Sequence, residues 1–350
     1  MDSVKTPKNV WFMSEGVRCA GWLYRPHPAA ATAPIVILGH GLGGTWQMRL
    51  DAFAERFVAQ GFVVLVFDYR FLGASEGEPR QLLDIRKQLN DWHAALAYAR
   101  GLPGVDTGRI AIWGSSFGGG HVMQIAAEDG KVAAVVAQCP FTDGFASLKA
   151  RLSTGFVSAL ALTAVGVADQ VGSWAGAPPL LVPMVGTPWL PAFLTAPDAI
   201  PGMAGLAPKG SQVARRTSRL LRWMPALEQS LLPGITLSER EVAGDQDSIW
   251  GAVVTPAGGR PFLNALAARL VLEIGLYRPG RSLRKLSMPV LVCVCDHDSV
   301  APAKATLHAA KQAPTAEVMR YPYGHFDIYV GDAFERVVAD QINFLRRSLQ

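Results

Sequence analysis

The chain has 350 residues, of which 50% are hydrophobic and 17% are charged, so it can bury a core large enough for one elaborated domain or two. The formal net charge is +5, but the basic residues are scattered without an aromatic-rich basic stripe, which argues against nucleic-acid binding. The four cysteines form neither a disulfide framework nor a metal-binding spacing (Cys19, Cys139, Cys293 and Cys295). Residues 1–9 lack the apolar segment of a signal peptide, so we expect a reduced, cytoplasmic protein.

The first part of the chain alternates short apolar strands with amphipathic helices. A β-hairpin is predicted over residues 10–12 and 17–24. Further strands are predicted over residues 35–38, 62–67, 110–113 and 132–139, and helices over residues 49–60 and 81–100. Strands made almost wholly of Val, Ile and Leu, with helices between them, predict a parallel sheet covered on both faces.

This alternation stops at residue 145, where a long segment rich in Ala, Leu, Gly and Pro begins. Asp169 is the only charged residue between Arg151 and Asp198. Residues 155–168 are apolar but form too short a run for a bilayer span, and five prolines interrupt residues 177–194. We interpret residues 145–259 as an apolar helical cap, including a basic amphipathic helix over 211–223. A cap that also touches membrane or lipid aggregates is the alternative.

The final part resumes the earlier pattern. Residues 262–277, 304–312 and 332–349 are predicted helices, and residues 289–295 and 317–321 are predicted strands. The domain plan is therefore a core made of residues 1–144 and 260–350, interrupted by a cap at residues 145–259.

A Gly-x-Ser-x-Gly motif lies between a predicted strand and a predicted helix, with Ser116 at its centre. In this context it predicts a nucleophile elbow, a tight bend that exposes the serine hydroxyl above the sheet. Gly114 and Gly118 leave room where a Cβ would clash with the adjoining strand and helix. The start of the helix also directs backbone N–H groups toward an oxyanion formed at that point.

A serine hydroxyl needs a base to take its proton, and the base needs a group that orients it. His325 follows a predicted strand, in a loop expected at the same sheet edge as the elbow, and is the candidate base. Asp298 is the favoured acid because it lies deeper in the loop before the next helix. Asp296 and Asp143 remain alternatives. The order Ser, Asp, His is the order of α/β hydrolases and of neither serine-protease type.

The glycine-rich stretch 40–44 follows the first strand of the parallel set. It lacks both the lysine of a P-loop and the spacing of a dinucleotide fingerprint, so we interpret it as one wall of an oxyanion hole. The expected donors are the amides of Leu42 and Phe117. His40 and Gly41 are expected to shape this loop, with His40 structural rather than a second base.

Five short motifs together resemble the serine-hydrolase branch of the α/β-hydrolase superfamily. They span residues 40–44, 68–70, 114–118, 298–302 and 324–327, and the likeness covers residues 10–144 and about 285–350. The resemblance implies an α/β-hydrolase fold: a mostly parallel sheet of about eight strands, helices on both faces, and a helical cap inserted after the sixth strand. The dienelactone-hydrolase-like, X-Pro-peptidase-like and fungal polyketide-transferase-like members look most similar. Cys295 and Phe71 stand where such proteins usually have glycine.

We therefore expect an esterase that cleaves hydrophobic acyl or aromatic esters through an acyl-enzyme on Ser116, with no metal or organic cofactor. The near absence of charge between residues 152 and 197 is the reason for expecting an apolar pocket. An acyltransferase or cyclase, or an amide or lactone hydrolase, would use the same triad and is the alternative. The expected partner is a small hydrophobic ester, without nucleic acid and without stable membrane insertion; a homodimer is a further expectation.

Overall fold

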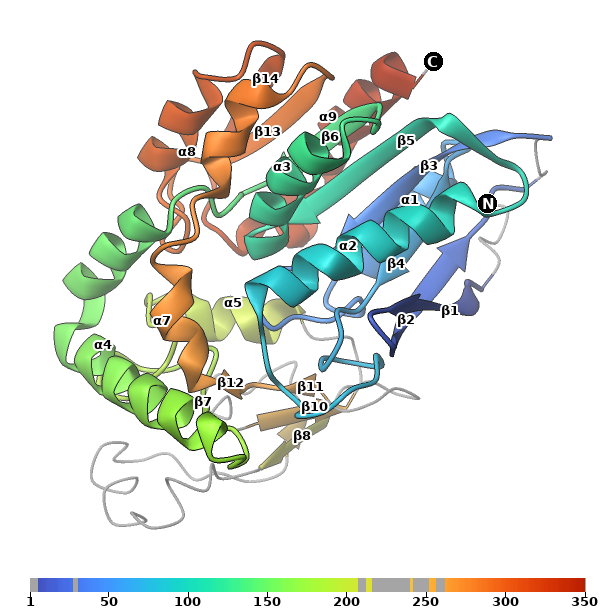
Figure 1. Ribbon diagram of the computed structural model, residues 1–350. Coiled ribbons are helices and arrows are strands. Elements are labelled where there is room, and N and C mark those ends of the chain that lie inside the picture. Colours follow the sequence, from blue (N-terminus) through green and yellow to red (C-terminus); the bar gives the residue numbers. More distant parts are fainter. Residues whose placement is uncertain are drawn as a thin grey trace.

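The computed structural model describes residues 6–27, 31–206, 212–215, 240–241, 252–255 and 262–349. Its main feature is an eight-stranded sheet in the order β1-β2-β4-β3-β5-β6-β13-β14 (Figure 1). The pairs β1/β2 and β2/β4 are antiparallel, and every other neighbouring pair is parallel. The strands are β1 (Lys8–Ser14), β2 (Val17–Tyr24), β3 (Ala33–Gly39), β4 (Val63–Phe67), β5 (Val105–Ser115), β6 (Ala134–Gln138), β13 (Val290–Cys295) and β14 (Ala316–Tyr321).

Helices cover both faces of this sheet. Helices α1 (Leu50–Val58) and α9 (Gly331–Leu349) pack on one face, and α2 (Ile85–Arg100), α3 (Phe117–Asp129) and α8 (Ala303–Ala310) pack on the other (Figure 1). Every residue of β4, β6 and β13 is buried, as expected for strands enclosed on both sides. The predicted fold class, with its opening hairpin and mostly parallel sheet, is confirmed.

One core helix starts later than predicted. The pattern predicts a helix from residue 81, whereas α2 begins at Ile85. The Asp84 side chain accepts a hydrogen bond from the amide of Lys87 at 2.9 Å and so caps the first turn. Gln81 has a φ of 65°, a left-handed conformation that no helix continues through.

The inserted segment leaves the sheet after β6, its sixth strand in chain order, and lies against the carboxyl edge of the sheet (Figure 1). Its described helices are α4 (Gly144–Trp174), bent at Gly155, and α5 (Ala199–Leu206). It also contains short strands, so it is not purely helical: β7 (Leu181–Val182), β8 (Gln212–Arg215), β9 (Arg240–Glu241) and β10 (Ala252–Thr255).

Two helices predicted around the insertion are not found in the part of the chain that the structure describes. The single helix predicted over residues 262–277 is wrong. That stretch forms β11 (Phe262–Leu263), β12 (Leu266–Ala267), the 3-10 helix η3 (Ala268–Leu270) and the short helix α7 (Val271–Ile274). The pairing of β12 with β7 extends the chain where periodicity alone suggested a helix. The basic helix predicted over 211–223 is strand β8 over residues 212–215, and residues 216–223 lie outside the described residues.

A buried ion pair holds α4 to the segment that follows the insertion. Asp169 receives two hydrogen bonds of 2.8 Å from the Arg269 guanidinium, and a further one from the backbone amide of Leu180 at 2.7 Å. The Asp169 side chain is fully buried and that of Arg269 is 15% exposed. Because η3 and α7 contact α4, residues 268–274 pack with the insertion, and the predicted domain boundary at residue 260 stays a prediction.

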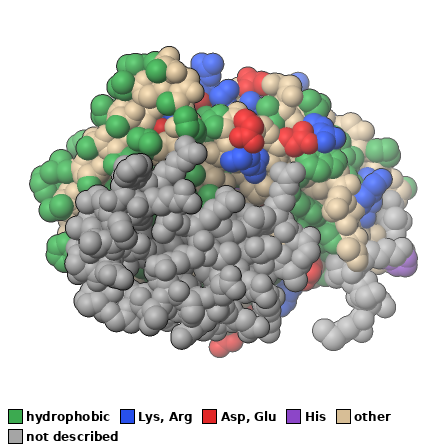
Figure 2. Space-filling model, turned by 90° about the horizontal axis from the view of Figure 1, so that it is seen from below, with side chains coloured by type: hydrophobic (Ala, Val, Ile, Leu, Met, Phe, Trp, Pro, Cys, Tyr) green, Lys and Arg blue, Asp and Glu red, His purple; other side chains and the backbone are tan. Residues whose placement is uncertain are grey.

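The outer side of α4 is apolar. Within the described residues, Gly155–Trp174 is the one stretch long and apolar enough to cross a membrane by length and composition, and 28% of its apolar window is buried. The apolar run over residues 155–168 is part of this longer helix, which continues to Trp174. Figure 2 shows hydrophobic side chains on the side where α4 lies. Exposed members of this helix include Phe145, Phe156, Val157, Leu160 and Trp174.

Candidate active site

The loops that carry the predicted site residues leave one edge of the sheet. Register pairs Gly39 with Gly114 and Ser115 with Gln138, and it pairs Cys295 with Tyr321. Parallel strands in this register end side by side, so the loops after β3, β5, β13 and β14 emerge together. Residues far apart in the sequence are thereby brought to one place.

Ser116 lies in a sharp bend between β5 and α3. Its backbone has φ 54° and ψ −117°, a strained conformation for a residue with a side chain. A Cβ on Gly114 would lie 2.1 Å from the carbonyl oxygen of Gly118, and a Cβ on Gly118 would lie 2.4 Å from that of His40. Glycine is required at both positions because the backbone passes so closely there. The bend thus has the geometry that the motif predicts.

Ser116, His325 and Asp298 form one hydrogen-bonded chain. The Oγ of Ser116 lies 3.0 Å from Nε2 of His325, and Nδ1 of His325 lies 2.7 Å from Oδ2 of Asp298. The side chains of His325 and Asp298 are 3% and 2% exposed. The other oxygen of Asp298 accepts hydrogen bonds from the amides of Val300 at 2.8 Å and Ala301 at 2.6 Å, which fixes the carboxylate in its loop.

The competing carboxylates make other contacts. Asp296 accepts a hydrogen bond from Arg320 at 2.9 Å. Asp143 caps α4 by accepting from the amide of Ala146 at 3.0 Å and also pairs with Arg278. Neither of these contacts involves His325, whereas Asp298 is bonded to it directly.

The charge beside His325 acts on its basicity. Burial by itself would lower the pKa of His325, but the Asp298 carboxylate, together with Cys139 in its thiolate form, raises it well above its ordinary value. A base of this kind holds its proton more firmly than a free imidazole. It also accepts the proton of a hydroxyl more readily.

Cys139, at the end of β6, lies against the same histidine. The ligand atoms of Cys139, Asp298 and His325 lie within 4.8 Å of one another, and among the described residues this is the one group of His, Cys, Asp or Glu close enough to hold a metal ion. Both ring nitrogens of His325 already contact Ser116 and Asp298. The expectation of a metal-free site stays a prediction.

The loop after β3 abuts the elbow as predicted for an oxyanion wall. A Cβ on Gly41 would lie 3.0 Å from the Cβ of Ser116, and Leu42 lines the same cavity as Ser116 and Phe117. Phe117 is the first residue of α3, so its amide has no acceptor within the helix. The two predicted donors therefore lie on either side of the serine, on the loop and on the helix start.

His40 is buried behind this loop. Its Nδ1 lies 2.9 Å from the carbonyl oxygen of Gly41, and its ring packs edge-on against Tyr69. Burial lowers the pKa of His40 to about 4, so the ring is neutral at pH 7. This environment fits the structural role predicted for it.

Two further histidines differ in their surroundings. His121 is buried and bonded to the Tyr277 hydroxyl at 2.8 Å and to Gln88 at 2.9 Å, so it packs in the core. His93 differs, because its side chain is 41% exposed and lies 2.9 Å from Glu128. It pairs on the surface instead of packing in the core.

The two departures from the usual glycines have different outcomes. Phe71 has a φ of 68°, the left-handed conformation in which glycine is ordinarily found, and it is buried. It follows Arg70, whose guanidinium donates hydrogen bonds to Asp91 at 2.7 Å and to Glu15 at 2.7 Å. Cys295 has an ordinary backbone and is buried at the end of β13.

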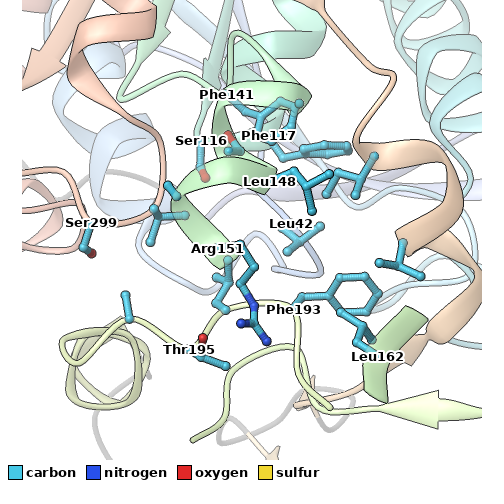
Figure 3. A pocket seen from close by; sticks show the side chains of 18 residues that line it. Leu42, Ser116, Phe117, Phe141, Leu148, Arg151, Leu162, Phe193, Thr195 and Ser299 are labelled. Atoms are coloured by element: carbon cyan, nitrogen blue, oxygen red, sulfur yellow. The ribbon is translucent and has the colours of Figure 1, made fainter. Parts of the chain in front are cut away.

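A cavity opens beside Ser116 (Figure 3). Its wall comes from the core loops and from the insertion together, and most of its lining is apolar. The lining includes Leu42, Ser116, Phe117, Ser147, Leu148, Arg151, Leu162, Phe193 and Thr195. A largely apolar, partly enclosed site suits a small hydrophobic molecule.

Sequence reasoning missed three polar members of this lining, Ser147, Arg151 and Thr195. Arg151 donates hydrogen bonds to the carbonyl oxygens of Gly155 and Ala192 and to the hydroxyl of Ser158. Its position at the start of the long uncharged stretch was a usable signal. Nothing comparable in the sequence marks the two hydroxyls.

The insertion touches the site loops at two glycines. Gly43 has a φ of +58°, and a Cβ there would lie 2.7 Å from the sulfur of Met184. A Cβ on Gly202, in α5, would lie 2.2 Å from the ring of Phe326, next to His325. The cap is thus packed directly against both the loop after β3 and the loop that carries the histidine.

Comparison with known proteins finds relatives that share this architecture. Residues 15–180 match the family described as X-Pro dipeptidyl-peptidase (S15 family). The crystal structure of the α/β hydrolase GrgF from Penicillium sp. sh18 superposes with a TM-score of 0.67 at 22% identity, covering 98% of this chain and 99% of GrgF. The quorum-quenching protein AidA of Acinetobacter baumannii is 45% identical over 343 residues, which are 98% of this chain and 95% of AidA.

The chain is an α/β hydrolase.

Within the α/β hydrolases it belongs to the serine-hydrolase branch, the group related to polyketide transferases, thiohydrolases and AidA. The esterase Est1E of Butyrivibrio proteoclasticus, solved with ferulic acid bound, shares the fold with a TM-score of 0.56 at 19% identity, over 97% of this chain and 98% of Est1E. Structural homologues of this α/β hydrolase thus bind small molecules. The resemblance inferred from the five motifs is confirmed.

Proposed function

We propose that this protein is a carboxylic ester hydrolase for substrates with hydrophobic acyl or aromatic groups, with Ser116, His325 and Asp298 as its catalytic triad. The observation that carries the proposal is the continuous hydrogen-bonded chain from Asp298 through His325 to Ser116, ending at an apolar cavity. Membership of the serine-hydrolase branch supports the reaction class.

In the proposed reaction, Oγ of Ser116 attacks the ester carbonyl carbon while Nε2 of His325 takes the hydroxyl proton. The tetrahedral oxyanion accepts hydrogen bonds from the amides of Leu42 and Phe117. Each such donor typically lowers the barrier by about 3 kcal/mol. The imidazolium then gives its proton to the leaving alkoxide, which departs as an alcohol and leaves an acyl-enzyme.

Water completes the cycle through the same groups. His325 takes a proton from water as the water attacks the acyl-enzyme, and then returns a proton to Ser116 as the free acid leaves. Asp298 keeps the imidazole in the tautomer that presents Nε2 to the serine and stabilises the imidazolium. No step requires a metal or an organic cofactor.

A second candidate uses the same triad on other acyl compounds. AidA, at 45% identity, is named for quorum quenching, and other relatives are named polyketide transferases and thiohydrolases. These names support acyl transfer to an alcohol or amine, or hydrolysis of a lactone, amide or thioester. Adding a competing alcohol and measuring the ratio of new ester to free acid separates transfer from hydrolysis. A panel of matched ester, thioester, lactone and amide substrates ranks the bonds.

The experiment that tests the proposal is active-site labelling combined with a chain-length series. A serine-reactive phosphonate is expected to label Ser116, and Ser116→Ala is expected to abolish labelling and turnover of butyl, octyl and aryl esters. An adduct on another residue would overturn the site. A preference for acetylated polysaccharide over these esters would overturn the substrate class. A cytoplasmic location and a homodimer complete the proposal and are testable by fractionation and by light scattering.

A further inference from the structure

A small polar group interrupts the apolar wall of the cavity. It consists of Ser147 and Arg151 on α4 and Thr195 on the segment before α5, here called the polar cluster. In Figure 3, Ser116 and Thr195 lie at opposite ends of the pocket view, and the guanidinium of Arg151 points toward the Thr195 end. Thr195 is therefore separate from the atoms that would carry out bond cleavage.

Two hydroxyls of the polar cluster have no hydrogen-bond partner among the described residues. Thr195 is 2% exposed, and both its Oγ1 and the Oγ of Ser147 are buried without a partner. A buried hydroxyl without a partner costs stability, and native proteins rarely retain one without a reason. A ligand that supplies an oxygen at this point would remove that cost.

Arg151 gives the polar cluster a positive charge, and its geometry selects among acceptors. One terminal nitrogen, Nη2, donates both to Ser158 Oγ at 2.6 Å and to the carbonyl oxygen of Ala192 at 3.0 Å. Both two-point edges of a guanidinium that grip a carboxylate include this nitrogen. With both hydrogens of this nitrogen engaged, bidentate capture of a carboxylate by Arg151 is disfavoured.

The described residues of the pocket thus combine a mostly apolar wall with a polar position inside it, where a substrate oxygen can accept a hydrogen bond. We propose that the acyl group of the substrate carries a neutral oxygen, a ketone or amide carbonyl, along its chain, and that the Thr195 hydroxyl donates a hydrogen bond to it. This inference rests on the proposed esterase function, which it narrows from hydrophobic acyl groups in general to acyl groups with an internal carbonyl. Thr195 is then a specificity-determining residue.

The test uses p-nitrophenyl octanoate and three analogues with a ketone at carbon 4, 5 or 6, with each rate divided by the hydroxide-catalysed rate of the same ester. The wild-type protein is expected to prefer one of the ketone esters over octanoate by about tenfold in kcat/KM, the value of one neutral hydrogen bond. Thr195→Val is expected to lose that preference, measured as the ratio of kcat/KM on the ketone ester to kcat/KM on octanoate. Thr195→Ser, which retains the hydroxyl, is expected to keep most of the preference.

Thr163→Val is the matched control, because Thr163 lies on the same helix as Arg151, bonds the carbonyl oxygen of Ala159, and is not among the cavity residues. It is expected to leave all four rates unchanged. The inference would be overturned if the wild-type protein preferred octanoate over every ketone ester, or if Thr195→Val lost kcat/KM equally on all four esters. Either outcome would leave the esterase proposal standing. A chain ending in carboxylate, preferred over the ketone esters, would overturn the choice of a neutral oxygen. Failure to hydrolyse any ester would overturn both proposals.

Discussion

The sheet edge and the cap contribute to one cavity by different physical means. At the sheet edge, backbone register and a strained turn place Ser116, and a single loop holds Asp298 by two amides. In the cap, placement depends on polar contacts between distant segments, above all the buried pair of Asp169 and Arg269. The comparison teaches that contacts within a few residues fix Ser116 and Asp298 in their loops, whereas the cap is held by contacts between distant segments.

The largest expected effect tests the sheet edge alone. Ser116→Ala removes the nucleophile, and kcat on p-nitrophenyl octanoate is expected to fall on the order of 10⁶-fold. The melting temperature should not fall, because the substitution leaves the glycines of the bend in place. Residual activity within tenfold of wild type would mean that another group carries the acyl intermediate.

The choice of acid gives the next largest effect. Asp298→Asn is expected to lower kcat by about 10⁴-fold, because an amide beside Nδ1 favours the wrong imidazole tautomer. Asp296→Asn is its matched control in the same loop and removes only the contact with Arg320, so little change is expected. Comparable losses in the two variants, measured by steady-state hydrolysis, would contradict the assignment.

The cap is tested through its buried ion pair. Asp169→Asn leaves the Arg269 charge without its partner, and a loss of about 3 kcal/mol in the free energy of unfolding is expected in urea denaturation. Glu317→Gln is the control, since its pair with Arg347 is more than half exposed on the Arg347 side and contributes little. The comparison between regions would fail if both variants changed stability equally.

Asp169→Asn also tests whether the reactivity of Ser116 is independent of substrate binding by the cap. Asp169→Asn is expected to raise KM for octanoate while phosphonate labelling of Ser116 persists, since the elbow does not depend on the cap pair. Loss of labelling in a protein that remains folded would show that the two regions are not independent.

The smallest effect concerns pH. Because Asp298 raises the pKa of His325, the imidazole keeps its proton to a higher pH, and kcat/KM is expected to rise with pH as the base becomes free. Removing the carboxylate charge lowers that pKa, so the acidic limb of the residual activity of Asp298→Asn should move to lower pH. Thr195→Val should keep the wild-type limb. An unmoved limb in Asp298→Asn would show that another group controls the profile.

Much of the core could be predicted because the patterns that determine it lie within short stretches of the sequence. Uninterrupted Val and Ile runs define the buried strands, and the glycines around Ser116 are needed by contacts within a few residues. The loop motifs around His40, Asp298 and His325 follow strands whose parallel register sends them to one edge. The hydrophobic pattern of the strands therefore sufficed to predict that these residues lie together.

The cap resisted prediction because its order comes from distant partners. Strand β12 pairs with β7 across more than eighty residues of chain, so the helical pattern of residues 262–277 was overridden. Asp169 was visible as an isolated charge, but its partner Arg269 was not. Thr195 carries no sequence signal, because a hydroxyl among apolar residues looks the same whether it faces solvent, backbone or a cavity.

The close approach at Gly43 has an engineering consequence. Met184 of the cap and Leu266 of β12 pack against Gly43, where any other residue would collide with them, so the cap fits closely against the loop beside Ser116. Exchanging this cap for that of a relative would require a matching thioether or branched chain at the junction. Without such a side chain, the exchanged cap is expected to displace the loop and to lower turnover on every substrate, including those for which the new cap was chosen.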